Sequence, residues 1–307
     1  NAMRLSVVIP VYNAAATLEE LLDRLGAVLV NCGRDYEIIL VDDGSRDRSW
    51  EIIRRRAARD SRIRGINLMR NYGQHNALLE GIKAVRHEVI VTLDDDLQNP
   101  PEEIPRLLDK LEEGYDVVYG TPIRKKHNFW RRAASGIIRM ILRAAVGAEI
   151  ARHISSFRAL RSRVRVAFES YRGPFIIIDA PLAWATTRFG AVAVRHEKRE
   201  GSKSNYNFRR LFFQAFNVLI GFSVQPLKFA SLIGFFLTFF GVGVLSYAVG
   251  RYLILGYSIP GFPFLASIIA IFSGAQLLVL GITGEYLSRM YFRTMGRPSG
   301  IIRETTD

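Results

Sequence analysis

Short apolar segments alternate with amphipathic segments of helical length through the first part of the chain. The strand candidates are Leu5–Val11, Tyr36–Val41, Arg64–Leu68, Val89–Leu93 and, further on, Val117–Gly120. Three helix candidates lie between these strands. The first follows Thr17, its expected N-cap, and the other two cover about Arg48–Arg59 and Gln74–Ala84. Strands that alternate with helices of this length predict an α/β fold with a mostly parallel sheet and helices on both of its faces.

Acidic residues follow two of these strand candidates directly. Asp42-Asp43-Gly44-Ser45 comes after the second strand, and Asp94-Asp95-Asp96 comes after the fourth. Ligands of parallel sheets bind at the carboxyl ends of the strands, so we expect both clusters to face one crevice.

The second cluster has the pattern of a divalent-cation site. Successive side chains at a strand end point to opposite faces, so Asp94 and Asp96 converge while Asp95 turns away, and Gln98 adds an amide oxygen. Mg²⁺ is usually held by one or two carboxylates together with phosphate oxygens of a substrate. The alternative is a solvated acidic turn. The first cluster offers hydrogen-bond acceptors for the N–H group of a nucleobase or the hydroxyls of a ribose. The alternative interpretation of the first cluster is an ordinary turn.

The charge is divided unevenly along the chain. Residues 1–123 carry 16 basic and 21 acidic residues, a net of −5, whereas residues 124–307 carry 26 and 8, a net of +18. A nucleic-acid binder is basic over its binding domain, so the acidic first part argues against that class. A basic, apolar second part predicts contact with an anionic membrane. The single cysteine, Cys32, excludes a disulfide scaffold.

Two long uncharged runs lie near the end of the chain. Phe229–Gly250 is 22 residues long between Lys228 and Arg251, and Phe264–Gly284 follows a connection rich in glycine and proline. Each is long enough to cross a bilayer as a helix, and a buried core helix is the alternative. Basic residues flank the pair on both sides, which predicts a transmembrane hairpin with both chain ends in the cytoplasm.

Two further stretches mix basic and aromatic residues without being long enough to span a membrane. Residues 129–146 and 207–222 are therefore predicted to lie at the membrane surface, with helices packed on the sheet as the alternative. The predicted domains are a cytoplasmic catalytic domain (3–206), a juxtamembrane helix (207–228), two transmembrane helices (229–284) and a basic cytoplasmic tail (285–307).

Several motifs resemble one known family. They are Ile9-Pro10-Val11-Tyr12-Asn13, Val41–Ser45, Arg70-Asn71-Tyr72-Gly73, and Asp94–Gln98 followed by Pro100-Pro101-Glu102. Together they resemble the family 2 glycosyltransferases, which have the Rossmann-like GT-A fold. The similar subgroup uses polyprenyl phosphate as acceptor and resembles dolichol-phosphate mannose synthase and the bacterial undecaprenyl-phosphate sugar transferases.

The resemblance implies roles for individual residues. Pro10, Tyr12, Asp42, Asp43 and Asp95 would bind the nucleotide, and Asp94, Asp96 and Gln98 would bind Mg²⁺ or Mn²⁺. The residues implied at the donor and acceptor phosphates, several of them catalytic, are Arg124, Arg131 or Arg132, Ser135, Arg199, Lys203 and Ser204. This sequence departs from the family pattern at Ala14, Asp95 and Ser202.

The implied activity is the inverting transfer of one sugar from a nucleotide sugar, with UDP favoured and GDP as the alternative, to polyprenyl phosphate, with undecaprenyl phosphate as the expected lipid. It would take place at the cytoplasmic face of a bacterial inner membrane and serve cell-envelope glycan or lipopolysaccharide modification. One alternative is a processive polysaccharide synthase, although its Gln-x-x-Arg-Trp motif is missing. The other is a membrane scaffold without enzyme activity. Oligomeric state stays open. Asp179 is interpreted as a supporting or acceptor-side carboxylate, or as a turn cap.

Overall fold

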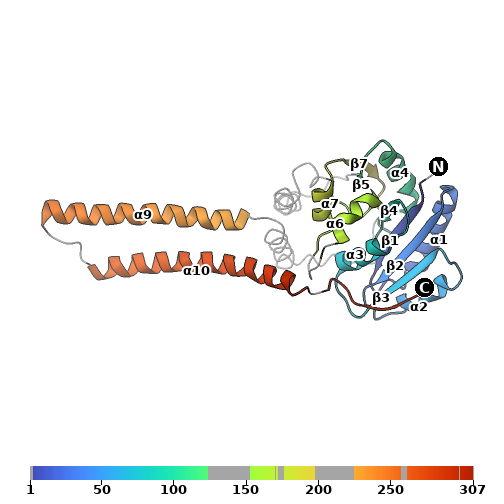
Figure 1. The fold of residues 1–307 in the computed structure, drawn as a ribbon, viewed down its shortest axis with the longest axis horizontal. Coiled ribbons are helices and arrows are strands. Elements are labelled where there is room, and N and C mark those ends of the chain that lie inside the picture. Colours follow the sequence, from blue (N-terminus) through green and yellow to red (C-terminus); the bar gives the residue numbers. More distant parts are fainter. Residues whose placement is uncertain are drawn as a thin grey trace.

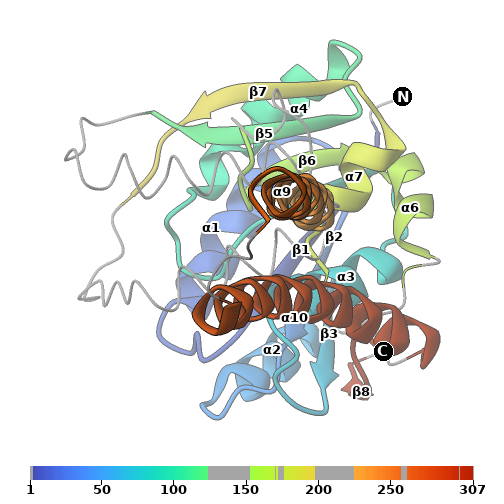
Figure 2. The same cartoon turned by 90° about the vertical axis from the view of Figure 1, so that its left-hand side faces the viewer.

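The computed structural model describes residues 3–123, 153–169, 171, 176–197, 225–256, 261–296 and 298–306. Within them one sheet has the strand order β7-β5-β6-β4-β1-β2-β3-β8, which Figure 2 shows running across the domain. The strands are β1 Leu5–Val11, β2 Tyr36–Asp42, β3 Ile63–Leu68, β4 Val89–Thr92, β5 Val117–Pro122, β6 Arg158–Arg161, β7 Phe189–Val194 and β8 Ile302–Thr305. The helices of the domain are α1 Leu18–Asn31, α2 Ser49–Ala57, α3 Gln74–Ala84, α4 Ile104–Glu112, α6 Val166–Glu169 and α7 Asp179–Ala185. Single 3₁₀ turns cover Pro101–Glu103 and Ser162–Arg165.

The central strands are parallel, as the alternation of elements predicts. β1 pairs in parallel with β2 and β4, and β2 pairs in parallel with β3. All seven residues of β1 and of β2 are buried, which is typical of parallel strands covered on both faces. The sheet becomes mixed toward its margins, because β6 runs antiparallel to both β4 and β5, and β8 runs antiparallel to β3.

Helices cover both faces of the sheet. Alternate β1 residues such as Val7 and Ile9 face α1, α2 and α4, whereas Val8 faces α3 on the opposite side. Helix α3 lies so close to the sheet that a Cβ atom on Gly81 would stand 2.3 Å from Cγ1 of Val8. This close packing requires glycine at position 81 and holds the second half of α3 against β1 and β2.

Thr17 precedes α1 as predicted, but its side chain makes no capping bond to the helix. Its Oγ1 instead donates a hydrogen bond to the carbonyl oxygen of Asp95, at 2.8 Å. The residue therefore ties the start of α1 to the second acidic cluster.

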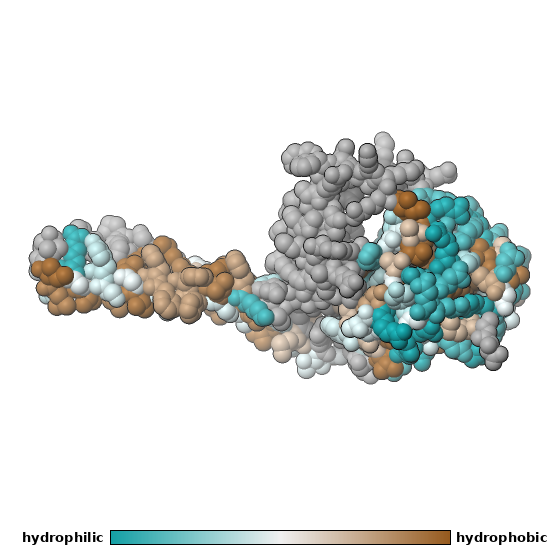
Figure 3. All heavy atoms as spheres, turned by 90° about the horizontal axis from the view of Figure 1, so that it is seen from above, coloured by the Kyte–Doolittle hydropathy of each residue, from teal (hydrophilic) through white to brown (hydrophobic). Residues whose placement is uncertain are grey.

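Two long helices extend from the domain and lie side by side (Figure 1). They are α9 Gln225–Leu255 and α10 Gly261–Thr294, and α10 is longer than the uncharged run because it continues beyond residue 284. The two helices pack closely where a Cβ on Gly241 would stand 2.7 Å from the ring of Phe272. Hydrophobic residues gather along this pair, whereas the described surface of the domain is mostly hydrophilic (Figure 3).

Helix α9 has the properties of a membrane span. Pro226–Ile254 is 29 residues long, and its most apolar stretch of 18 residues has a mean hydropathy of 2.1 and no residue buried inside the protein. Within the described part of the chain, it is the one helix that meets both the length and the hydropathy criteria. The second span and the hairpin topology stay predictions.

The chain returns to the sheet after α10. Residues that we expected in a basic tail form β8, which pairs with β3 so that Thr305 lies opposite Ile66 and Glu304 opposite Asn67. An edge strand offers a row of unpaired backbone groups, and β8 occupies that row on β3. The C-terminal segment is therefore part of the same sheet as the strands that carry the acidic clusters.

Glu37 on β2 is a buried carboxylate that connects three parts of the fold. It accepts hydrogen bonds from Ser6 Oγ at 2.6 Å, from the backbone N–H of Arg86 at 2.7 Å and from the Arg64 guanidinium at 3.1 Å. Burial raises the pKa of Glu37, but these hydrogen bonds and the Arg64 charge outweigh it, so the pKa is lower than the ordinary value.

We predict that Glu37→Gln lowers the free energy of unfolding at pH 7 by about 2–3 kcal/mol, because an amide N–H would face the Arg64 guanidinium. A carboxylate with a lowered pKa stabilises the fold above its unfolded pKa of about 4.3 and loses that contribution as the pH falls through the folded value. The difference between Glu37→Gln and wild type should therefore shrink below about pH 4.3. Urea unfolding across this range measures it, and a difference that does not change with pH would contradict the assignment.

Candidate active site

The two acidic clusters lie on either side of the end of β1. Val11 at the end of β1 is opposite Asp42 on β2, while Val8 is opposite Thr92 at the end of β4. The backbone N–H of Tyr12 donates to Oδ2 of Asp95 at 3.0 Å, and that of Asn13 donates to Oγ of Ser45 at 3.0 Å. The loop after β1 therefore contacts both clusters, and the clusters share one edge of the sheet.

Asp43 organises the loop before α3. Both of its carboxylate oxygens accept backbone N–H groups, from Tyr72 at 2.7 Å and from Gly73 at 2.8 Å. Burial raises the pKa of Asp43, and these two hydrogen bonds oppose the rise. The side chain of Asp43 therefore holds the loop before α3 in place, and the nucleotide-binding role that the family resemblance implies for it stays a prediction.

Asp42 keeps one acceptor atom unused. The residue is only 1% exposed, and its Oδ2 accepts the backbone N–H of Ser45 at 3.2 Å. Its Oδ1 is buried and has no hydrogen-bond partner. Burial raises the pKa of this carboxyl group. A buried acceptor without a donor is costly unless a ligand supplies one.

Gly44 allows the first cluster to turn tightly beneath the neighbouring loop. Its φ is +67°, in the left-handed region that favours glycine. A Cβ atom there would stand 2.6 Å from the carbonyl carbon of Arg70 and 2.8 Å from the backbone nitrogen of Asn71. Because both neighbours are backbone atoms, neither can rotate out of the way.

Residues outside the acidic motifs support the second cluster. Asp94 accepts hydrogen bonds from Nε2 of Gln74, at 2.6 Å, and from Oγ of Ser156. Asp96 accepts the backbone N–H and the side-chain amide of Gln98. No sequence motif marks Gln74 or Ser156, because each reaches Asp94 only through the tertiary fold. Gln98, which we expected as a metal ligand, donates to Asp96 here.

The three adjacent carboxylates hold excess negative charge in a partly buried place. Burial raises the pKa of Asp94, and the charge of Asp96 adds to the rise. Burial, with Asp94 and Asp96 nearby, raises the pKa of Asp95 to about 6. Leu97, directly after the cluster, has φ +58°, an unusual conformation for a leucine that costs about 1–2 kcal/mol. Local strain of this kind is typical of functional sites.

The donor set fits a hard divalent cation that also takes substrate oxygens. Among the described residues, no group of three or more His, Cys, Asp or Glu side chains is arranged to enclose a metal ion. Mg²⁺ needs only one or two protein carboxylates when phosphate oxygens complete its coordination. Asp94 and Asp96, which repel each other across the site, meet that requirement.

A buried ion pair lies near this cluster. Arg158 on β6 pairs with Asp179 at the start of α7, and the hydroxyl of Tyr119 donates to the same Asp179 oxygen at 2.8 Å. All three side chains are almost completely buried. Of the roles considered for Asp179, this placement favours the supporting one, and the charge of Arg158 also opposes the rise in the pKa of Asp94.

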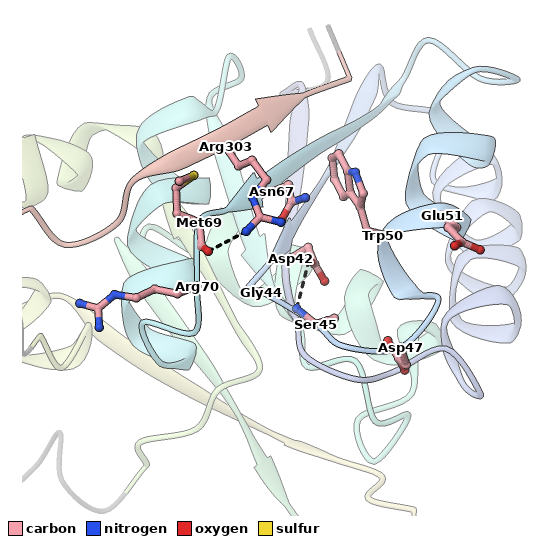
Figure 4. Close-up of a pocket in the computed structure, with 10 residues that line it drawn as sticks. All are labelled: Asp42, Gly44, Ser45, Asp47, Trp50, Glu51, Asn67, Met69, Arg70 and Arg303. Carbon is pink, nitrogen blue, oxygen red and sulfur yellow. Dashed lines mark hydrogen bonds between the residues drawn. The ribbon is translucent and has the colours of Figure 1, made fainter.

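A cavity of about 270 Å³ opens at the ends of β2 and β3 (Figure 4). Asp42, Ser45, Trp50 and Asn67 line it, and Arg303 reaches it from β8. It lies on the β3 side of the first cluster, so the cavity and the second cluster flank the end of β1 from opposite sides.

The predicted phosphate-binding residues lie outside the described residues. They are Arg124, Arg131, Arg132, Ser135, Arg199, Lys203 and Ser204. The same holds for the predicted interfacial stretches 129–146 and 207–222. Their roles stay predictions.

Known proteins share this fold and this sequence pattern. The fold is similar to that of glucosyl-3-phosphoglycerate synthase from Mycobacterium tuberculosis, solved with Mn²⁺, UDP and glucosyl-3-phosphoglycerate, at a TM-score of 0.50 and 20% identity over 71% of this chain and 78% of that one. The architecture is thus that of a GT-A transferase. The glycosyl transferase family 2 profile matches residues 6–167.

Relatives match nearly the whole chain. An undecaprenyl-phosphate 4-deoxy-4-formamido-L-arabinose transferase from Shewanella sediminis is 40% identical over 97% of this chain and 91% of its own length. A protein of the same name from Pseudomonas aeruginosa is 37% identical over 95% of this chain and 87% of its own. The chain belongs to glycosyl transferase family 2 and is an enzyme of that family.

We predict that Gly44→Ala lowers the free energy of unfolding by about 2–4 kcal/mol, because it adds a backbone clash to the strain of a positive φ. Gly33→Ala is the matched control, since Gly33 also has a positive φ of +61° but has no atom within 4 Å of a Cβ. It should cost only about 1 kcal/mol. Urea unfolding of both variants measures the difference, and equal losses would show that the contact with residues 70 and 71 is not tight.

Proposed function

We propose that this enzyme transfers a single sugar from a nucleotide sugar to undecaprenyl phosphate, with inversion at the anomeric carbon. The observation that carries the proposal is the similarity to undecaprenyl-phosphate sugar transferases over 97% of the chain, which includes the long helices as well as the catalytic domain. Similarity confined to the sheet would support only the class of reaction. Similarity that extends over α9 and α10 also supports a lipid-linked acceptor.

The donor is a UDP-sugar, and UDP-4-deoxy-4-formamido-L-arabinose is the first sugar to test, given the names of the relatives. The nucleoside would supply the donor that the buried Oδ1 of Asp42 lacks, and Pro10 and Tyr12 lie at the end of β1, between the cavity and the second cluster. A nucleoside diphosphate laid across β1 would reach from the cavity at β2 and β3 to Asp94 at β4.

Asp94 and Asp96 would hold Mg²⁺ or Mn²⁺, with Gln98 keeping Asp96 in place. When bound, the cation neutralises charge on the departing nucleoside diphosphate. Gln74 and Ser156 orient Asp94 through their hydrogen bonds. The three carboxylates would otherwise repel both each other and an anionic donor.

The acceptor needs little activation. A phosphate monoester is already anionic near neutral pH, because its second pKa is about 6, so its oxygen can attack without a strong general base. Positioning two anionic substrates together is the harder task. Arg124, Arg131 or Arg132, Ser135, Arg199, Lys203 and Ser204 are the residues that we propose for it, because planar guanidinium groups bind phosphate oxygens through paired hydrogen bonds.

The proposed location is the cytoplasmic face of a bacterial inner membrane. Helix α9, and α10 beside it, would anchor the protein as a hairpin, with the catalytic domain and both chain ends in the cytoplasm. The exposed apolar surface of α9 supports membrane insertion. The sugar-lipid product would serve lipopolysaccharide or other cell-envelope modification.

The test of this function is the incubation of membranes that contain the enzyme with a panel of radiolabelled UDP- and GDP-sugars. We expect label from a UDP-sugar to enter the lipid fraction and to depend on added undecaprenyl phosphate. Label that appears in a polymer would support a processive synthase instead. No transfer to lipid from any donor in the panel would contradict the proposal.

We predict that Asp96→Asn lowers the rate of lipid labelling about 100-fold or more, because a cation that stabilises a leaving diphosphate contributes several kcal/mol. Asp109→Asn is the matched control, since Asp109 is an exposed residue on α4 away from the site. Initial rates at saturating Mg²⁺ and Mn²⁺ measure both variants. A normal rate in Asp96→Asn would remove the metal assignment.

A further inference from the structure

The C-terminal strand β8 contributes Arg303 to the lining of the cavity at the ends of β2 and β3. Arg303 extends from β8 over Asn67, and its guanidinium donates to the carbonyl oxygen of Met69 at 2.9 Å (Figure 4). Arg70, which also lines the cavity, points away from its centre in the same view. A residue more than 200 positions away in sequence therefore faces the first acidic cluster.

Specific contacts hold β8 in one register. The backbone N–H of Met69 donates to the carbonyl oxygen of Ile301 at 2.8 Å, and that of Gly65 donates to Oγ1 of Thr306 at 2.8 Å. Before the strand, Ser299 donates to Glu80 on α3. Because these contacts lie on both sides of Arg303, they fix its backbone position, and the hydrogen bond to Met69 holds its side chain at the cavity.

The cavity presents complementary polar groups beside an aromatic ring. Asp42 supplies one unpartnered, buried carboxylate oxygen, and its other oxygen is taken by Ser45. Arg303 carries several N–H donors, of which one goes to Met69. Trp50 provides a ring at the same cavity. A ligand that fits must offer an N–H donor next to a carbonyl acceptor on a flat, partly apolar body.

We propose that Arg303 is a donor-binding residue, which contacts the nucleobase of the nucleotide sugar and completes a subsite selective for uracil. This inference rests on the proposed function. Uracil has a ring N–H flanked by carbonyl groups, so Asp42 accepts the N–H and Arg303 donates to a carbonyl. Guanine offers two neighbouring N–H groups that suit both oxygens of a carboxylate, and Asp42 has only one available.

The charge of Arg303 has a second effect at this place. Asp42, Asp47 and Glu51 all line the cavity and would repel an anionic nucleotide. Arg303 is the basic side chain that opposes the buried Asp42 carboxylate across the cavity, and its charge counters the rise in the pKa of that group. The segment that follows the two long helices therefore contributes Arg303 to the donor site, and donor affinity depends on that side chain.

The test measures nucleotide affinity of the full-length protein by titration calorimetry with UDP, GDP and uridine. We predict that Arg303→Ala weakens the binding of UDP and of uridine by about 10- to 100-fold, because a charged hydrogen bond is lost. Arg303→Lys keeps the charge, so its affinity for UDP should lie between that of wild type and that of Arg303→Ala. Wild type should prefer UDP to GDP, and Arg303→Ala should narrow that preference.

Two control variants separate the side chain from the strand. Thr306→Val removes one side-chain hydrogen bond at the end of β8 but keeps Arg303 and the backbone pairing of the strand, and Arg62→Ala removes one surface charge that pairs with Asp60. Both should keep the UDP affinity within about twofold of wild type. The inference would be overturned if Arg303→Ala bound UDP as tightly as wild type, or lost affinity for UDP but not for uridine. It would also be overturned if Thr306→Val weakened UDP binding as much as Arg303→Ala does, or if the wild-type protein preferred GDP to UDP. A wild-type protein that binds neither nucleotide would instead contradict the proposed function itself.

Discussion

Negative charge held at the carboxyl edge of a parallel sheet is the constraint on which this site depends. Carboxylates from Asp42-Asp43 and Asp94–Asp96 meet at this edge because β2 and β4 are both neighbours of β1. Burying such groups is costly unless donors satisfy them. The surrounding loops supply those donors, mostly as backbone N–H groups, so the carboxylates set the shape of the loops as well as the chemistry of the site.

Two parts of the site have carboxylates whose charge or hydrogen bonds the protein does not fully satisfy. Substrate groups would bind at both of them. One oxygen of Asp42 has no donor, and the pKa values of Asp94 and Asp95 are raised, so the charge at β4 is not fully balanced by the protein. A nucleobase with an N–H group would donate to the unpartnered oxygen of Asp42, and a divalent cation bound to a diphosphate would neutralise the charge of Asp94 and Asp95. These two parts of the site lie on opposite sides of β1, which suits one elongated nucleotide.

The central fold could be predicted from the sequence because its elements carry local signals. Strands β1 to β4 are apolar runs, and α3 matches its predicted range of Gln74–Ala84. Strands β6 and β8 could not be predicted from the sequence. Arg158–Arg161 and Ile302–Thr305 are short, contain charged residues and become strands because they pair with segments far away in the chain. The acidic clusters were visible as motifs, whereas Gln74, Ser156 and Arg303 reach the site only through tertiary contacts.

The most direct measurement is an experimental structure of the full-length protein with UDP and Mn²⁺. We predict that the uracil ring lies in the cavity between Asp42 and Arg303, that the metal ion binds Asp94 and Asp96, and that the diphosphate lies between the base and the metal ion. A base bound elsewhere, or a metal ion that takes no oxygen from either aspartate, would contradict it.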